Sequence, residues 1–155
     1  MKRTIKIVLI VAAVLFFAAQ FIRPDLANPP LDAQQRLEAS VVVPDEVAAV
    51  LQRSCNDCHT NQTSFPWYSQ ITPVSWWLKD HVDHGREELN FSDWGTYSAS
   101  KKEKKLEEIC EQAESRDMPL PSYTWAHWSA PLSDSEIKVI CDWTRSEQSK
   151  LVNPQ

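Results

Sequence analysis

Two cysteines and a histidine in the run Cys55-Asn56-Asp57-Cys58-His59 have the types and spacing of a covalent haem-attachment motif. Positions i, i+3 and i+4 of a helix share one face, so both thiols and the imidazole can meet one flat ligand. Cys55 and Cys58 would form thioethers with the haem vinyl groups. His59 would bind the iron as the proximal ligand, with an acceptor such as a backbone carbonyl on its other ring nitrogen. The motif predicts one covalently attached haem c.

A thioredoxin-like dithiol and half of a zinc site are the competing interpretations of the same cysteines. A redox Cys-x-x-Cys belongs near a βαβ pattern, but residues 45–53 instead have the pattern of a short amphipathic helix that follows Pro44. A zinc site would need two more ligands, usually a second close pair, whereas Cys110 and Cys141 are isolated and far apart. Haem attachment therefore remains the leading hypothesis.

Met118 is the leading candidate for the sixth iron ligand. It is the sole methionine after the initiator and lies in a proline-braced loop about sixty residues after His59, and thioether sulfur is a common axial ligand of electron-transfer haem. His127 is the main alternative, as a ligand or as a supporting donor. His81 lies on an apolar helix face, which favours a buried histidine over a ligand, and His84 is expected to point elsewhere.

Aromatic side chains are expected to form much of the haem pocket wall, because their rings exclude water and their polar atoms can reach propionates. Arg86 is a candidate propionate partner, with a surface ion pair to a nearby glutamate as the alternative. The aromatic residues in question are Trp67, Tyr68, Trp76, Trp77, Trp94, Tyr123 and Trp125.

The composition favours one helical domain. The chain has 155 residues with ten prolines and only two glycines, which disfavours a β-sandwich with many glycine-dependent turns. The net charge of −5 makes nucleic acid an improbable partner.

The N-terminal segment resembles a membrane-directed signal. Lys2, Arg3 and Lys6 precede an uninterrupted apolar run from Ile7 to Ala19. We expect residues 1–22 to be an uncleaved anchor that forms a transmembrane helix, with the basic end inside and the remainder outside. A cleaved signal peptide that releases the protein to the periplasm is the alternative.

The remaining chain is expected to comprise a tether at residues 23–43 and a haem-binding domain at residues 44–155. Four helices are predicted in this domain: one that ends in the haem motif, one that opens at Thr72-Pro73 and runs to about Leu89, and two with capping boxes, Ser100 with Glu103 and Ser133 with Glu136. Residues 116–123 are expected to be an extended loop because of their prolines. Cys110 and Cys141 could form a disulfide or remain two buried thiols.

The order of these motifs resembles the bacterial haem-binding domain family of small, membrane-anchored proteins with a single c-type haem. The resemblance implies an all-α, cytochrome-c-like domain that is exported before haem is attached to Cys55 and Cys58 and bound by His59. It rests on the haem motif and on four further runs, Phe65-Pro66-Trp67-Tyr68, Pro73 to Trp77, Gly85 to Trp94 and Met118 to Tyr123.

The expected function is that of a membrane-anchored single-electron carrier on the periplasmic side of the inner membrane, with His59 and Met118 as iron ligands and an unidentified redox partner. This makes an electron carrier a better expectation than an enzyme. A haem-based sensor or peroxidase-like protein with an open distal site is the alternative, and a dithiol oxidoreductase is the third.

Overall fold

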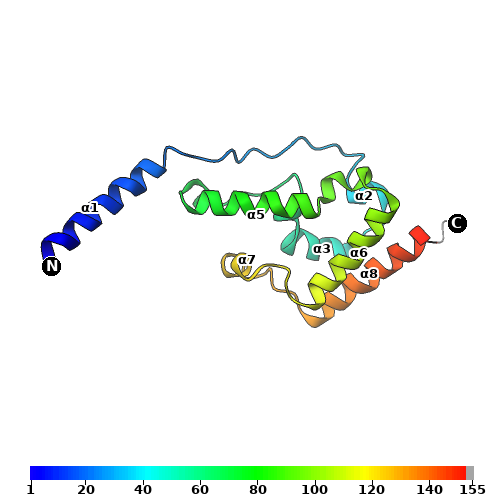
Figure 1. The fold of residues 1–155 in the computed structure, drawn as a ribbon. Helices are drawn as coiled ribbons and strands as arrows, with labels where there is room; N and C mark the ends of the chain where they lie inside the picture. The colour runs from blue at the N-terminus through cyan, green and yellow to red at the C-terminus, as the bar shows by residue number, and fades with distance from the viewer. Residues whose placement is uncertain (153–155) are drawn as a thin grey trace.

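The computed structural model describes residues 1–152, which form helices and no strand (Figure 1). This confirms the predicted all-α class. The helices are α1 (Lys2–Ala19), α2 (Leu37–Ser40), α3 (Asp45–Ser54), α4 (Asn56–His59), α5 (Val74–Glu88), α6 (Ala99–Glu114), α7 (Pro121–Ala126) and α8 (Asp134–Val152), with 3₁₀ helices η1 (Trp67–Gln70) and η2 (Phe91–Thr96).

Local capping explains where the two long C-terminal helices begin. The predicted capping box of α8 is confirmed, since the Ser133 backbone N–H donates to Glu136 Oε2 at 2.9 Å and the Glu136 N–H donates to Ser133 Oγ at 3.3 Å. The predicted box at Ser100 is wrong. Ser98 caps α6 instead, because its extended backbone lets its hydroxyl accept from the Lys101 N–H at 3.2 Å.

The proline-containing segment after α6 is only partly extended. The expected loop over residues 116–123 is interrupted by α7, which begins at Pro121. Proline is compatible with the first turn of a helix because the N–H it lacks would have no helical partner there. Pro121 therefore begins a helix where an extended loop was expected, whereas α6 already ends at Glu114.

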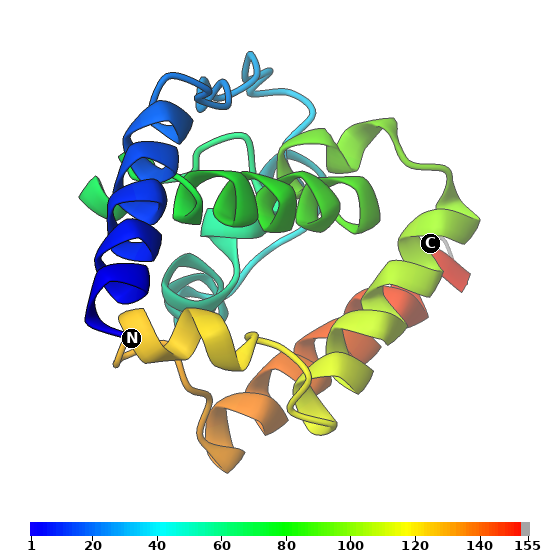
Figure 2. The same cartoon turned by 60° about the vertical axis from the view of Figure 1, so that its left-hand side comes forward.

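The main hydrophobic core is formed by side chains of η2 and of the helices α2, α3, α6 and α8. Helices α6 and α8 lie side by side in both ribbon views (Figures 1 and 2). Leu37 of α2 is only 1% exposed, so part of the segment expected to be a tether packs into the domain. The core consists of Leu37, Val47, Leu51, Phe91, Trp94, Leu106 and Trp143.

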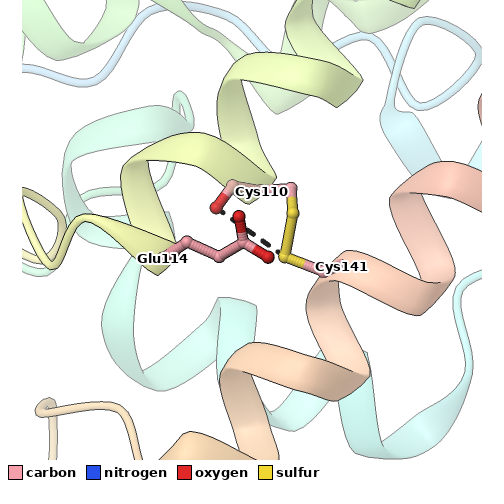
Figure 3. Close-up of side chains that lie close together, drawn as sticks. All are labelled: Cys110, Glu114 and Cys141. Atoms are coloured by element: carbon pink, nitrogen blue, oxygen red, sulfur yellow. Dashed lines mark hydrogen bonds between the residues drawn. A yellow bond between two sulfur atoms is a disulfide. The ribbon is translucent and has the colours of Figure 1, made fainter.

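A disulfide between Cys110 and Cys141 joins α6 to α8 (Figure 3), with the two Cα atoms 4.8 Å apart. Glu114 lies beside the sulfurs, and its carboxylate pairs with Arg145 at 3.1 Å. Each sulfur is bonded to the other, so this group offers no thiolate to a metal ion. Its role in the fold is to hold the two helices together.

Within residues 1–152, no helix has the length and apolar character needed to cross a membrane. The expected transmembrane helix over residues 1–22 is therefore not supported. The helix formed there, α1, has 18 residues and carries Lys2, Arg3 and Lys6 in its first turns, whereas a full span needs about 20 predominantly apolar residues.

Candidate functional site

The haem motif forms a single helical turn at the end of α3. The backbone N–H groups of Cys58 and His59 both donate to the Cys55 carbonyl, at 3.1 and 3.0 Å. Cys55 and Cys58 are free thiols, and both line the same cavity as His59. The three side chains are thus gathered at one cavity, as the spacing predicts.

This cavity has a volume of about 660 Å³, within the range of roughly 300–1,000 Å³ that is typical of small-molecule and cofactor sites. Helices α3 to α6 and α8 contribute to its wall, together with the segment that leads from α6 into α7. The wall is mostly apolar and includes Leu51, Leu89, Phe91, Ile109, Ala113, Met118, Pro119, Leu120, Leu132 and Ile140.

The His59 ring is oriented by the carbonyl end of α5. Its Nδ1 lies 2.9 Å from the carbonyl oxygen of Gly85 and 2.9 Å from that of Leu89. A carbonyl can only accept, so Nδ1 carries the proton and Nε2 keeps a free lone pair. Burial lowers the pKa of His59, although the two carbonyl contacts oppose this shift. The ring is thereby held as a neutral imidazole, the form that binds a metal.

Gly85 allows α5 to approach the motif closely. A Cβ atom at this position would lie 2.9 Å from the Cys58 carbonyl oxygen and 3.1 Å from Cys58 Cβ. Glycine in a helix interior costs about 1 kcal/mol relative to alanine. This cost is offset by a contact that brings the α5 carbonyls within reach of His59.

Both motif thiols are held in their neutral form. Burial raises the pKa of Cys55 to about 12 and that of Cys58 to about 11, and the proximity of the two groups adds to the shift of Cys55. Redox-active dithiols have lowered thiol pKa values instead. This environment disfavours thiol–disulfide exchange.

Met118 lines the cavity and is half-buried, and its backbone N–H donates to the Gln112 carbonyl at 3.1 Å. The structure therefore brings Met118 to the same cavity as the motif, and its iron-ligand role stays a prediction. His127 does not line this cavity, and its ring stacks on Tyr123 with the centroids 4.0 Å apart.

The two histidines of α5 lie differently from the sequence-based expectation. His81 is half-buried at the cavity wall, where its ring lies tilted against Trp77 with the centroids 4.2 Å apart, so the expectation of a core position is wrong. His84 also borders the cavity, but it is mainly exposed and pairs with Asp80 at 3.5 Å. The Nδ1–H of each ring donates to the backbone carbonyl four residues earlier, His81 to Trp77 at 2.8 Å and His84 to Asp80 at 2.9 Å.

Most of the aromatic residues expected around the haem lie elsewhere, and Tyr123 is the member of that set at the cavity. Trp94 is fully buried in the main core, and four other tryptophans are exposed: Trp67, Trp76, Trp77 and Trp125. Arg86 was a candidate propionate partner, but its guanidinium donates to the Thr60 carbonyl, Thr63 Oγ1 and Asn28 Oδ1. It braces the chain beyond the motif.

Two features of the site were missed by sequence reasoning. Tyr123 of α7 donates a hydrogen bond to Asp57 Oδ2 at 2.8 Å, which links the segment after Met118 to the haem motif. The side chain of Lys105 lines the cavity and is only 12% exposed to solvent. Its Nζ lies 2.6 Å from Glu108 Oε2. Lys105 belongs to a lysine-rich run, Lys101 to Lys105, of a kind that usually forms a solvated helix face, but it directly precedes the buried Leu106.

The donor set fits haem: two thiols, an imidazole with a free Nε2, and a thioether all border one mostly apolar cavity. Fold and site thus define an all-helical haem-binding domain. A family model described as a haem-binding domain matches residues 14–146, and the chain belongs to this family. Comparisons with curated proteins and with solved structures gave no match.

Replacing Gly85 with alanine should force α5 away from the motif. We expect Gly85→Ala to lower the free energy of unfolding by about 1–2 kcal/mol, because overpacking costs roughly 1–3 kcal/mol and the better helix propensity of alanine recovers part of it. Urea unfolding of the apoprotein measures this change. Glu87→Ala, on the exposed side of α5, is the control. A Gly85→Ala protein as stable as the parent would contradict the close-approach argument.

Proposed function

We propose that this haem-binding protein is a mono-haem c-type cytochrome that carries single electrons. The observation that carries the proposal is the His59 ring, held with Nε2 free at a cavity that it shares with Cys55, Cys58 and Met118. Haem bound there would supply one-electron redox chemistry.

The protein's own residues have distinct roles in this proposal. Cys55 and Cys58 would form the two thioethers, and their neutral thiols stay close together at the cavity wall. His59 and Met118 would be the two iron ligands that the protein supplies. The carbonyls of Gly85 and Leu89 orient His59 and raise its basicity as a ligand. Apolar side chains such as Leu89 and Ile140 exclude water from the cavity.

The two alternative functions have weaker support. In a peroxidase-like protein, Arg86 or His127 would be the side chain that assists peroxide chemistry, and neither residue lines the cavity. A dithiol oxidoreductase would need an activated thiolate, whereas burial raises the pKa of both motif cysteines. An electron carrier therefore agrees best with the side chains at the site.

Covalent attachment can be tested with cysteine variants made in a bacterial host that carries c-type haem maturation machinery. We expect the parent chain to gain the mass of one haem and to keep it on a denaturing gel. Cys55→Ser and Cys58→Ser should each retain one thioether, and the double variant should lose its haem under denaturing conditions. A parent chain without covalent haem would overturn the c-type assignment.

The sixth ligand can be tested by Met118→Ala. Loss of the Met118 sulfur should open the distal position and allow rapid carbon monoxide binding to the reduced protein. It should also lower the reduction potential by on the order of 0.1 V, because axial ligands set haem potentials. Leu120→Ala removes an apolar side chain from the same cavity wall and should keep the parent spectrum. An unchanged low-spin spectrum and potential in Met118→Ala would point to a histidine ligand.

We also propose that the protein is exported and held at the outer face of the inner membrane through residues 1–22. The apolar side chains of α1 are exposed along its length, and basic residues lie at its start. The Cys110–Cys141 disulfide agrees with an oxidising compartment such as the periplasm. Lipid is therefore the proposed partner of α1, and a redox protein is the proposed partner of the haem domain.

Deletion of residues 2–22 tests this localisation. The full chain should sediment with membranes and carry covalent haem, whereas the deleted chain should remain in the cytoplasm with reduced Cys110 and Cys141 and no haem. A standard cleavable signal peptide in place of residues 1–22 should restore haem and the disulfide but not sedimentation. A full chain that is soluble, with its N-terminus removed, would favour the secreted alternative.

A further inference from the structure

The segment that carries Met118 is tied to the haem motif by one side-chain contact. Tyr123 donates to Asp57 Oδ2 at 2.8 Å, and Asp57 lies between Cys55 and Cys58 in the motif. The Tyr123 hydroxyl also lies 3.4 Å from the Arg53 carbonyl oxygen. Tyr123 borders the cavity together with Met118 and Cys58. A hydroxyl–carboxylate bond thus joins the two sides of the cavity.

Asp57 is itself held in place by the loop that follows the motif. Its other carboxylate oxygen, Oδ1, accepts from the Ser64 N–H at 3.1 Å, and its backbone carbonyl accepts from Thr63 Oγ1 at 2.6 Å. The carboxylate is therefore a fixed acceptor. A hydrogen bond to a fixed, charged acceptor is stronger and more directional than one to a mobile surface group.

The Tyr123 side is equally well connected to Met118. The Tyr123 N–H donates to the Leu120 carbonyl at 2.9 Å in the first turn of α7, and Leu120 follows Met118-Pro119 directly. The ring of Tyr123 stacks on His127 with an interplanar angle of 17°. A short, ordered stretch of backbone thus connects Tyr123 to Met118.

We infer that Tyr123 is a positioning residue whose hydrogen bond to Asp57 holds the Met118 segment closed over the cavity and thereby controls access to the distal iron position. The inference deepens the proposed cytochrome function and rests on it. It assigns to the aspartate of the haem motif a role separate from haem attachment, as the acceptor that anchors the distal segment.

Tyr123→Phe tests the inference, since it removes the hydroxyl and keeps the ring that stacks on His127. A hydrogen bond to a charged group contributes enough that its loss should raise the open population of the segment about tenfold or more. We therefore expect carbon monoxide to bind the reduced haem protein at least tenfold faster than in the parent, approaching the rate of Met118→Ala. Covalent haem should be unchanged, because Cys55, Cys58 and His59 are intact.

A second measurement does not depend on haem. Amide hydrogen exchange over residues 118–126 of the apoprotein should accelerate in Tyr123→Phe. Asp57→Asn, which keeps an acceptor oxygen, should show a smaller change in both measurements. Tyr97→Phe is the control for the exchange measurement, because Tyr97 is similarly half-buried and its hydroxyl accepts from the Asn90 N–H, outside the 118–126 segment.

The outcomes separate this inference from the proposed function. Absence of covalent haem in the parent would refute the cytochrome proposal, and the exchange measurement would still test the contact. Normal haem with unchanged carbon monoxide binding and exchange in Tyr123→Phe would overturn the inference. Equal acceleration in Tyr123→Phe and Tyr97→Phe would overturn it as well, because the effect would then be general loosening.

Discussion

The imidazole of His59 meets the carbonyl end of α5, and the arrangement of the cavity depends on this contact. Nδ1 lies 2.9 Å from both the Gly85 and the Leu89 carbonyl oxygens. Two acceptors on one nitrogen place the proton on Nδ1 and leave the Nε2 lone pair free to bind a metal. The contact is possible because Gly85 has no side chain between α5 and the Cys58 carbonyl. The haem motif and α5 are consequently one structural unit.

The opposite wall of the cavity is held by different interactions. The Cys110–Cys141 disulfide joins α6 to α8, next to Ile109 and Ile140, which line the cavity. From the end of α6 the chain continues to Met118 and α7, where Tyr123 bonds back to Asp57 of the motif. Covalent and hydrogen-bonded links thus hold the wall on which the distal ligand is proposed to lie.

Helical periodicity predicted the long helices well but not which part of each apolar face is buried. In α5 the apolar positions include Trp77 and His81, yet the buried residues are Ser75 and Val82. The α5 surface packs closely on its neighbours, and close packing favours small residues such as Ser75 and Gly85 over large rings. Trp77 is left 47% exposed. The expected aromatic wall is wrong for six of its seven members, which do not line the cavity.

Local sequence patterns sufficed to predict the haem site, the helical class and the capping box at Ser133, because each depends on residues within a few positions of one another. The folded structure was needed to show that the carbonyls of Gly85 and Leu89 orient His59 and that Cys110 pairs with Cys141. It was also needed to show that Met118 borders the cavity while His127 does not, and that Tyr123 reaches Asp57. These contacts join residues 26 to 66 positions apart. Their geometry depends on how the helices pack, which no local pattern specifies.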